Sequence, residues 1–591
     1  MIADKALTRV LYIDLSKKSY WVKERPELFE KYLGGTGVAT KLLKEELKPT
    51  ADPLGPNNVV VMAVGIFTGA YPTASKTVTM FKSPLTGNLG ESHAGGRSAV
   101  AIKMSGFGAI VIKGESDIPV YLSIHDGKVY FRDATALWGV RSTYTVGRVI
   151  REREGWPGLR SIMRIGRAGE KLIRYAGVVT ETYRHFGRLG LGAVWGSKKL
   201  KAVVVGGRRG IKVADARKYR EVYDKLYNRI VKSDLMKKYH DLGTPVNIIP
   251  LNKIGALPTR NLTSARFEKA EEISGEAIAA TMLARRVACS HCPVACIHIA
   301  AIREEYPHEK YFYTTRYVSY DYEPLYALGT MLGISDREGL MRLIEEVEVQ
   351  GMDAMSTGVA LAWATEAFSR GIISEKETIV KPSWGDWKTY IQMVRYIVEQ
   401  PNEFYKKLGE GTAEAAKTYG GEEFAMVFGK NEMPGYHAGP ATHLGYAIGA
   451  RHSHLDNAGY SYDQKLIGKE YPPPEKVIDD LMKEEAWRQI LSSLVLCFFA
   501  RKVYTPEIVS EALEPLGIKM SPEDLKKLGW EIYAEKYRLK LELGFDLEKD
   551  LKLPKRIFET PSPHGMISEE FMKKALDHFR ARIRELTGFK A

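Results

Sequence analysis

The sequence predicts an α+β protein in which a β-rich N-terminal domain is followed by two largely α-helical domains. Short runs of β-branched and aromatic residues, bounded by Gly, Pro or Ser, fill roughly the first third of the 591 residues. After Gly210, apolar residues recur at helical spacing among many charges. A glycine pair at 420–421 then interrupts this pattern. We therefore predict domains at residues 1–210, 211–420 and 421–591.

The strand predictions of the first domain come from four short runs and one hairpin. The runs are Arg9–Asp14, Asn58–Ala63, Thr77–Phe81 and Ala109–Lys113. Between Val120 and Arg132, alternating residues flank Asp126-Gly127, a dipeptide that suits the type I′ turn of a two-residue hairpin.

The helix predictions cover most of the remaining chain. The clearest periodic patterns lie at Lys212–Tyr239, Asp336–Gln350, Thr357–Ser369, Glu475–Phe499 and Glu569–Leu586. We found no internal repeat and no low-complexity tract in the sequence.

Composition and charge argue against a secreted, a membrane-spanning and a nucleic-acid-binding protein. The N-terminal residues lack the apolar core of a secretory signal, and no apolar run approaches the roughly 20 residues that span a bilayer. A soluble, cytoplasmic protein without membrane association is therefore expected. The net charge of +14 is spread among acidic residues rather than gathered in one stripe. This pattern does not indicate nucleic-acid binding, but it suits an acidic redox partner.

The four cysteines of the chain form a distinctive pattern. Cys289, Cys292 and Cys296 make a CxxCxxxC cluster, and Cys497 lies in a remote apolar run. Three thiolates from one short loop and a fourth from elsewhere can hold a cubane iron–sulfur cluster. Structural zinc usually takes two separate CxxC pairs, radical-SAM clusters use the reverse spacing, and disulfides need an oxidising compartment. The cysteines therefore favour an iron–sulfur cluster over these alternatives.

Three glycine-rich stretches lie in the N-terminal domain. They are residues 33–37, 85–97 and 187–199. Each one alone is typical of a tight turn. Together they favour a large phosphate-bearing ligand, because glycines let the backbone N–H groups approach phosphates. Neither the P-loop nor the dinucleotide-binding fingerprint is present.

Candidate acid–base residues gather in two downstream segments. Glu323 follows the cysteine cluster, and residues 434–457 contain four of the thirteen histidines, with Gly and Pro between them. This spacing predicts a loop that lines a site. His452 and His454 also have the spacing of two zinc ligands, but no third ligand lies near them in the sequence.

Taken together, these motifs resemble the aldehyde:ferredoxin oxidoreductase family, whose members carry tungsten in a bis-pterin cofactor. The resemblance extends over nearly the whole chain. It is carried by residues 32–37, 82–87, 95–96, 166–176, 187–198, 289–296, 351–358 and 497.

The resemblance implies specific roles for many residues. The N-terminal domain would form a base for the pterins, and the four cysteines would bind one 4Fe–4S cluster. Glu323 and His454, with His452 as the alternative to His454, would act on the substrate. The residues expected around the pterins are Lys76, His93, Gly95, Gly96, Arg97, His185, Gly187, Arg188, Glu348, Asp353, Ser492 and Leu496.

The chain departs from the family pattern at the cofactor-binding residues. Lys76 stands where an arginine commonly bridges cluster and pterin, and lysine lacks the planar guanidinium fork. Glu348 and Ser492 replace the aspartates of the two pterin-binding motifs. His185 stands where the family usually has a small residue. One pterin is therefore expected to be held differently.

The resemblance predicts oxidation of a small aldehyde to a carboxylic acid, with ferredoxin accepting the electrons. Pterin sulfurs bind molybdenum as well as tungsten, so either metal is compatible with the sequence. A magnesium ion could bridge the pterin phosphates. Two alternatives are a reductive reaction at the same cofactor and a non-catalytic electron-transfer subunit. A homodimer and a complex with an electron-transfer subunit are both compatible with the sequence.

Overall fold

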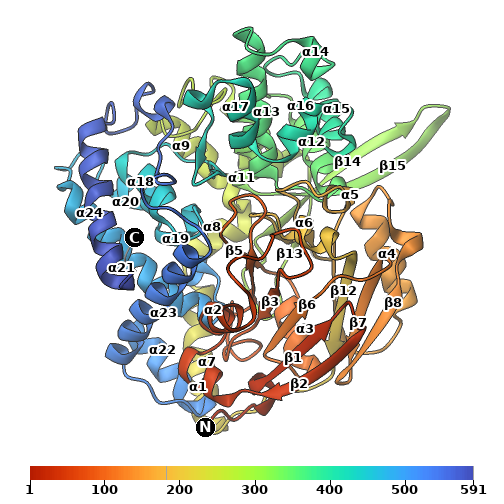
Figure 1. The fold of residues 1–591 in the computed structure, drawn as a ribbon, viewed down its shortest axis with the longest axis vertical. Helices are drawn as coiled ribbons and strands as arrows, with labels where there is room; N and C mark the ends of the chain where they lie inside the picture. Colours follow the sequence, from red (N-terminus) through yellow and green to blue (C-terminus); the bar gives the residue numbers. More distant parts are fainter. Residues whose placement is uncertain (182, 590–591) are drawn as a thin grey trace.

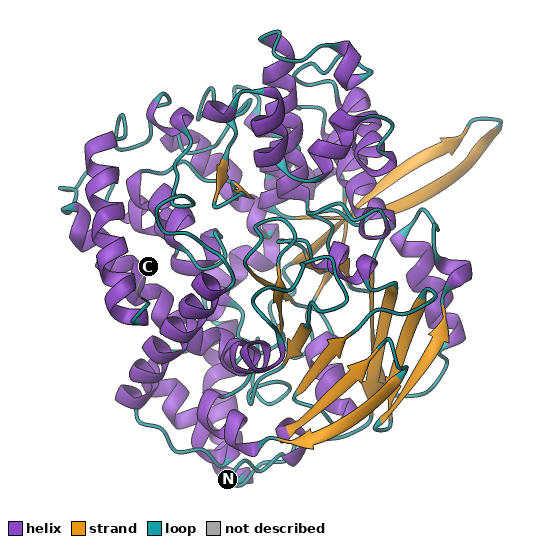
Figure 2. Cartoon of the chain, in the orientation of Figure 1, coloured by secondary structure: helices purple, strands orange, loops and turns teal. Residues whose placement is uncertain are grey.

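The structure is a computed structural model that describes residues 1–181 and 183–589. Two six-stranded sheets build the N-terminal part, and most of the remaining chain is helical (Figures 1 and 2). The predicted α+β fold class is therefore confirmed. Within the described residues, no helix has both the length and the apolar character needed to cross a bilayer.

The first sheet contains all four predicted strand runs. Its strands β1 and β6 are parallel, and the other neighbours are antiparallel. In spatial order the strands are β2 (Ser19–Glu24), β1 (Arg9–Asp14), β6 (Ala109–Lys113), β3 (Val60–Ala63), β4 (Thr77–Lys82) and β5 (Leu89–Ala94).

The second sheet contains the predicted hairpin. Asp126 and Gly127 both have positive φ, as a type I′ turn requires, and β7 pairs with β8 on either side of them. In spatial order the strands are β11 (His185–Phe186), β10 (Val178–Val179), β9 (Leu159–Arg164), β12 (Leu200–Gly207), β7 (Val120–His125) and β8 (Lys128–Asp133).

The strands β1, β6, β3 and β4 of the first sheet are buried on both faces. Alternate residues such as Leu11 and Ile13 pack towards the second sheet, while Val10 and Tyr12 pack towards helices that include C-terminal ones. Helices of the N-terminal part are α1 (Pro26–Tyr32), α2 (Gly35–Glu46), α3 (Ser98–Ser105), α4 (Thr143–Arg153), α5 (Arg167–Glu170) and α6 (Leu191–Ser197). The first sheet therefore connects the two halves of the chain.

The helices after residue 210 surround a second, larger core. Up to residue 420 they are α7 (Ala216–Val231), α8 (Asp234–Leu242), α9 (Ile248–Ile254), α10 (Gly275–Thr281), α11 (Tyr322–Ala327), α12 (Arg337–Gln350), α13 (Ala354–Ser369), α14 (Glu375–Thr378), α15 (Trp387–Glu399), α16 (Glu403–Gly409) and α17 (Thr412–Tyr419). They continue with α18 (Pro440–Ile448), α19 (His454–Asn457), α20 (Gly459–Lys465), α21 (Pro474–Ser493), α22 (Pro506–Leu513), α23 (Pro522–Glu542) and α24 (Glu569–Thr587).

Three details of the helical prediction are wrong. The pattern from Lys212 to Tyr239 is split into α7 and α8, since residues 232 and 233 are not helical. Helix α21 ends at Ser493, before Cys497. The region between residues 211 and 420 also contains a three-stranded antiparallel sheet of β13 (Leu283–Val287), β14 (Ile297–Tyr306) and β15 (Glu309–Tyr320).

Candidate active site

The CxxCxxxC loop connects β13 to β14 and is tied to the N-terminal part by backbone hydrogen bonds. Ser290 N–H donates to the carbonyl oxygen of Gly96 at 2.9 Å. Thr73 N–H donates to the carbonyl oxygen of His291, and Thr73 accepts from Cys497 N–H, both at 3.0 Å. Thr73 thus joins the two cysteine-bearing segments, which are about 200 residues apart in the sequence.

All four cysteines are free thiols and partly buried. Burial and the neighbouring cysteines raise the pKa of Cys292, and the same causes, opposed by the charge of Arg184, raise the pKa of Cys296 to about 12. Bound metal would be needed to hold them as thiolates at neutral pH. The four side chains therefore form one electrostatically connected donor set.

A single metal ion and an iron–sulfur cluster require different spacings of their ligands. Tetrahedral zinc, with Zn–S bonds of about 2.3 Å, would bring its sulfur atoms to within about 4 Å of one another. Among the described residues, no three Cys, His, Asp or Glu side chains lie close enough to hold one metal ion. A cubane cluster accepts more widely spaced thiolates, because four irons lie between them.

Gly95 leaves space beside this donor set. A Cβ atom at this position would lie 2.9 Å from Cys289 Sγ and 3.4 Å from Lys76 Nζ. Arg184 lines the same position, and its guanidinium donates to Asp321 Oδ2 at 2.7 Å. Lys76 Nζ and Cys289 Sγ therefore both lie close to Gly95, and Arg184 adds a planar guanidinium that the sequence did not indicate.

Glu323 and His454 form a buried pair. Glu323 lies in the first turn of α11, two residues after its N-cap residue Asp321, and His454 begins α19. The distance from His454 Nε2 to Glu323 Oε1 is 3.1 Å, and the His454 side chain is only 7% exposed. His454 Nδ1 is buried and has no hydrogen-bond partner among the described residues. It is therefore available to a bound ligand.

The electrostatics of this pair keep Glu323 ionised. Burial raises the pKa of the Glu323 carboxyl, but the hydrogen bond and charge of His454, with the charge of Arg184, outweigh burial. The pKa consequently lies below its ordinary value. A carboxylate in such a site is ready to accept a proton at neutral pH.

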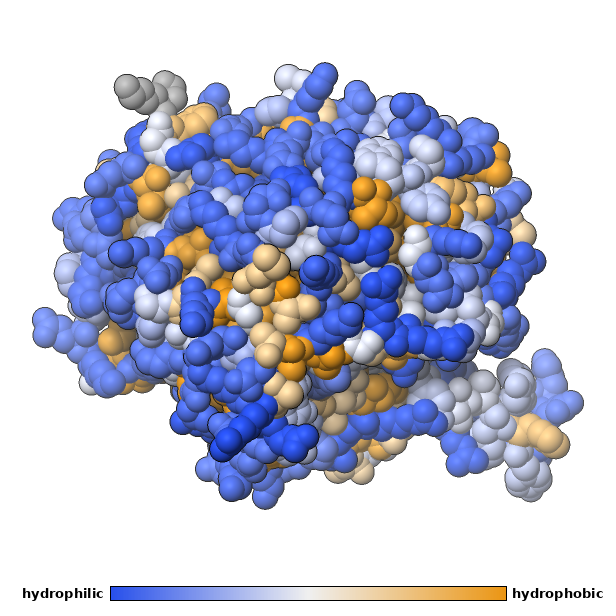
Figure 3. All heavy atoms as spheres, turned by 90° about the horizontal axis from the view of Figure 1, so that it is seen from below, coloured by the Kyte–Doolittle hydropathy of each residue, from blue (hydrophilic) through white to orange (hydrophobic). Residues whose placement is uncertain are grey.

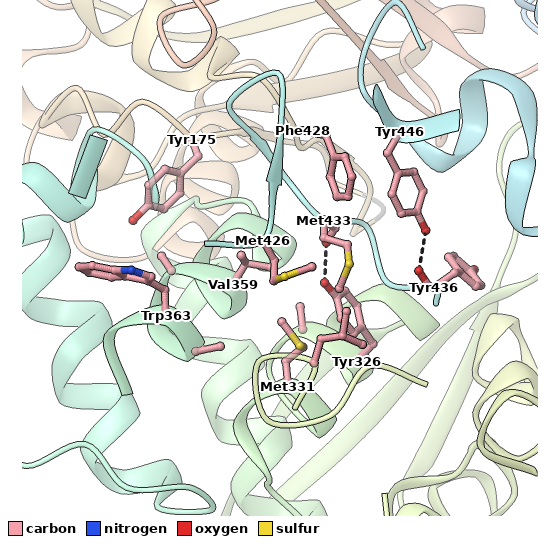
Figure 4. Packing of buried hydrophobic residues seen from close by; sticks show 14 of the residues in the cluster. Tyr175, Tyr326, Met331, Val359, Trp363, Met426, Phe428, Met433, Tyr436 and Tyr446 are labelled. Carbon is pink, nitrogen blue, oxygen red and sulfur yellow. Dashed lines mark hydrogen bonds between the residues drawn. The ribbon is translucent and has the colours of Figure 1, made fainter. Parts of the chain in front are cut away.

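Tyrosine rings surround the pair. The Tyr436 ring centroid lies 5.5 Å from that of His454 and 4.2 Å from that of Tyr460. The Tyr436 segment is fixed by hydrogen bonds to its backbone, including Tyr446 Oη to the Tyr436 carbonyl at 3.2 Å and Tyr326 Oη to the Met433 carbonyl at 2.5 Å (Figure 4). These rings hold the pair in a water-poor environment that strengthens its interactions.

The other predicted histidines do not join this site, so the expectation of one histidine-lined loop is wrong. His452 Nδ1 lies 3.0 Å from the Tyr446 carbonyl oxygen and Nε2 lies 3.0 Å from Lys540 Nζ. Burial and the Lys540 charge lower the pKa of His452 to about 3. His437 and His443 contact each other at 2.8 Å and are fully buried, His443 within α18.

Many of the conspicuous glycines make room for protein backbone rather than for a ligand. A Cβ atom at Gly35 would lie 2.1 Å from the Ser492 carbonyl oxygen, and one at Gly196 would lie 1.9 Å from that of Gly169. In contrast, a Cβ at Gly187 would touch only His185, at 3.8 Å. The first stretch therefore joins the first sheet to α21, whereas at Gly95 and Gly187 only side chains lie within 4 Å of the Cβ position.

Two predicted cofactor residues are carboxylates that already have cationic or donor partners. Glu348 accepts from Tyr144 Oη and lies 3.0 Å from His185 Nε2. Asp353 caps α13 and pairs with Arg188 Nε at 3.0 Å. His185, the residue that departs from the family pattern, thus faces Glu348, which also departs from it.

A third predicted residue, His93, belongs to a buried charge network. Its Nε2 lies 2.6 Å from Glu91 Oε1, and Glu91 pairs with Lys536 of α23. Burial lowers the pKa of His93 to about 4, so the ring is neutral at physiological pH. Lys540 of the same helix donates to Asn88 Oδ1 at 2.8 Å.

The remaining predicted cofactor residues occupy varied environments. Ser492 and Leu496 are buried, and Leu496 packs in the hydrophobic core. Arg97 is exposed at the N-cap of α3, while Gly96 has φ of 93° and is bonded to the cysteine loop. Their roles in binding a pterin stay predictions.

Comparison with known proteins identifies the family. Residues 10–207 match the model of the aldehyde ferredoxin oxidoreductase N-terminal domain, and residues 221–591 match that of its domains 2 and 3. The chain belongs to the aldehyde ferredoxin oxidoreductase family.

Individual relatives agree with this assignment. The chain is 35% identical to the tungsten-containing aldehyde ferredoxin oxidoreductase of Thermococcus kodakarensis and 34% identical to that of Pyrococcus furiosus. Each match covers 94% of this chain and 92% of the relative. The solved active-site complex BamBC of benzoyl-coenzyme A reductase shares the fold, with a TM-score of 0.83 at 21% identity, covering 100% of this chain and 95% of that one. The prediction of an oxidoreductase of this family is thus confirmed.

For this aldehyde ferredoxin oxidoreductase family member, sequence reasoning missed Arg184, Thr73, and Lys536 and Lys540 of α23. Arg184 lies next to His185 in the sequence, but its partner Asp321 is 137 residues away. No local spacing could show that contact. The available signal was the adjacency of Asp321 to Glu323 in an otherwise aromatic segment.

Proposed function

We propose that the protein oxidises aldehydes to carboxylic acids at a tungsten bis-pterin centre and passes the electrons through a 4Fe–4S cluster to ferredoxin. The observation that carries this proposal is the buried Glu323–His454 pair with its unpartnered imidazole nitrogen. Asp321 and Arg184 connect this pair to the cysteine donor set, since Arg184 acts electrostatically on Glu323, Cys289 and Cys296.

The residues fit the expected groups. The four cysteines would bind the cluster, and Lys76 and Arg184 would present their charges beside it. Arg188, Asp353, His185 and Glu348 would face the pterins. When bound, the tungsten centre supplies a Lewis acid and a two-electron acceptor.

Glu323 and His454 would perform the proton chemistry. The Glu323 carboxylate accepts a proton from a water molecule as the water oxygen attacks the aldehyde carbon. His454 Nδ1–H donates a hydrogen bond to the aldehyde oxygen, where negative charge develops. The overall reaction consumes one aldehyde and one water and releases one carboxylic acid, two protons and two electrons. The tyrosine surroundings exclude competing water.

Metal analysis of the anaerobically purified native protein tests this proposal first. We expect about four irons, as one cubane cluster requires, together with about one tungsten or molybdenum per chain. Zinc without iron and tungsten would overturn the cluster assignment. Iron without tungsten or molybdenum would instead support an electron-transfer subunit.

A panel of aliphatic and aromatic aldehydes with benzyl viologen as acceptor then tests the reaction. Dye reduction by at least one aldehyde is expected. Failure with every aldehyde in tungsten-loaded protein would favour the alternative, a reductive reaction at the same cofactor.

A further inference from the structure

The antiparallel sheet β13–β15 extends away from the body of the molecule. Strands β14 and β15 form a long hairpin that projects beyond every neighbouring helix (Figures 1 and 2). The same projection appears at the right-hand edge of the surface view (Figure 3). We call this hairpin, residues 297–320, the arm.

One face of the arm is lined by tyrosine and arginine. Tyr313 and Tyr317 are four residues apart on β15, so their side chains share a face. Tyr311 lies nearer the tip, where a φ of 70° and a register shift interrupt the alternation. The exposed fractions of Tyr311, Tyr313 and Tyr317 are 86%, 45% and 38%. The register pairs Ala301 with Tyr317 and places Arg303 opposite Thr315, on the same face. These aromatic side chains are therefore unusually exposed for residues of their size.

Arginines stack on these rings. The Arg303 guanidinium carbon lies 4.3 Å from the Tyr313 ring centroid, and that of Arg285, on β13, lies 5.5 Å from the Tyr317 ring centroid. Such cation–π contacts hold long side chains in place before a partner arrives. Tyr and Arg are also the side chains most enriched among the residues that dominate protein–protein binding energy.

The base of the arm is the cysteine loop itself. Strand β14 starts at Ile297, directly after Cys296. Arg286 Nε donates to the His240 carbonyl oxygen of α8 at 2.9 Å, and His240 Nδ1 lies 2.8 Å from the Val294 carbonyl oxygen inside the loop. Lys237 and Lys238 of α8 are exposed. Exposed cations thus lie on α8 and β13 beside the cysteine loop, with the exposed acids Asp234 and Asp241 among them on α8.

We propose that the tyrosine–arginine face of the arm and the adjacent surface of α8 form the docking site for an acidic iron–sulfur electron-carrier protein. The cysteines at the base supply the redox connection, and the cations supply charge complementarity. A second copy of this chain is the less favourable occupant, because two copies that each carry a net charge of +14 repel one another. This inference rests on the proposed function. It adds the surface at which the electrons would pass to the carrier protein.

The test compares two acceptors on the holoenzyme. The double variant Arg285→Glu/Arg303→Glu is assayed with an aldehyde and either benzyl viologen or a purified acidic two-cluster ferredoxin. A small dye does not need the arm, so its reduction rate should change by less than about twofold. The KM for ferredoxin should rise about tenfold or more, as expected when charges at an interface are reversed. The double variant Tyr313→Ser/Tyr317→Ser should also raise the KM for ferredoxin. It should change the salt dependence of this KM less than the arginine double variant does.

Controls separate the possible outcomes. The variant Tyr20→Ser/Lys128→Glu changes exposed residues on β2 and β8, far from the arm in sequence and sheet, and should leave both acceptors unaffected. Direct binding of the same ferredoxin, measured by calorimetry, tests the docking site even if aldehydes prove not to be substrates. Equal ferredoxin affinity in natural and arm-variant protein would overturn the inference. So would a change in oligomeric state, measured by light scattering, without a change in ferredoxin KM, since the arm would then join two copies.

Discussion

At the scale of single residues, the site depends on side chains whose environments set their chemistry. Glu323 and His454 are 131 residues apart in sequence, but their side chains are in contact, and tyrosine side chains pack next to them. The sequence resemblance identified both residues. It left His452 as the alternative to His454, and the structure favours His454, because both nitrogens of His452 already have partners.

Replacing Glu323 by Gln should lower kcat by at least about 100-fold, because the amide cannot accept the proton. Iron and tungsten contents should not change, since Glu323 is not among the predicted ligands. Steady-state kinetics with viologen and metal analysis provide the measurement. Near-normal turnover in a variant with full metal content would remove Glu323 from the mechanism.

Gly95→Ala should reduce the iron content of the purified protein. The added methyl group would lie 2.9 Å from Cys289 Sγ, so the cysteine must move. Gly155→Ala is a suitable control, because its added methyl group meets nothing within 4 Å and Gly155 does not have a positive φ. Iron content equal in the two variants would show that Cys289 is not constrained as described.

Lys540 should make stability depend on pH. Burial lowers its pKa from 10.5 to about 7, with nearby acids opposing the shift. Between pH 7 and 10.5 the unfolded chain binds more protons than the folded one, so Lys540 makes stability rise with pH in this window. Lys540→Met removes this term. The Tm of the variant relative to the natural protein should therefore be about 2 °C more favourable at pH 6.5 than at pH 9.5, as calorimetry would measure.

At the scale of secondary-structure elements, local patterns predicted the strands and long helices well. These local patterns gave the wrong secondary structure where packing against distant parts of the chain, rather than local sequence, determines the conformation. Residues 434–457 appeared to be a loop because Gly and Pro are frequent there, yet His443 lies in the middle of buried helix α18. Gly439 and Pro440 mark the start of that helix rather than its absence.

The arm was not predicted from the sequence, because a hairpin within a helical region produces only a short alternating pattern. Its outer part should be dispensable for folding. Replacing residues 305–313 by Asn-Gly would join the paired residues Glu304 and Thr314 through a type I′ turn. The removed residues are nearly all exposed, so Tm should fall by less than about 2 °C and metal content should stay constant. A large drop in Tm would show that the arm packs more tightly than its exposure indicates.

At the scale of the whole molecule, the predicted domains interlock rather than fold side by side. Glu91 of β5 is fully buried, and its charge partner Lys536 comes from α23. Gly35 and Gly65 approach the backbone at the end of α21. No sequence pattern announces such contacts, because each partner is an ordinary residue in its own segment. The family resemblance, which spans the chain, predicted the architecture but not these connections.

An isolated fragment of residues 1–210 should therefore fail to unfold cooperatively. It would leave Glu91 without Lys536, and an unpaired buried charge costs about 3 to 5 kcal/mol. It would also expose the sheet face that packs on the C-terminal helices. Circular dichroism during heating would show a broad, gradual change, whereas the full chain should show a steep transition. A steep transition in the fragment would contradict this account.

The separation of the cysteines has a consequence for biosynthesis. Three of the proposed cluster ligands leave the ribosome together, but Cys497 follows Cys296 by about 200 residues. At roughly 5 to 20 residues per second, this delay lasts about 10 to 40 s. Throughout that interval the three thiols are present without the fourth, and Thr73 cannot yet hold both segments. If the four cysteines bind one cluster, as proposed, ligation by all four thiolates must therefore follow synthesis of most of the chain.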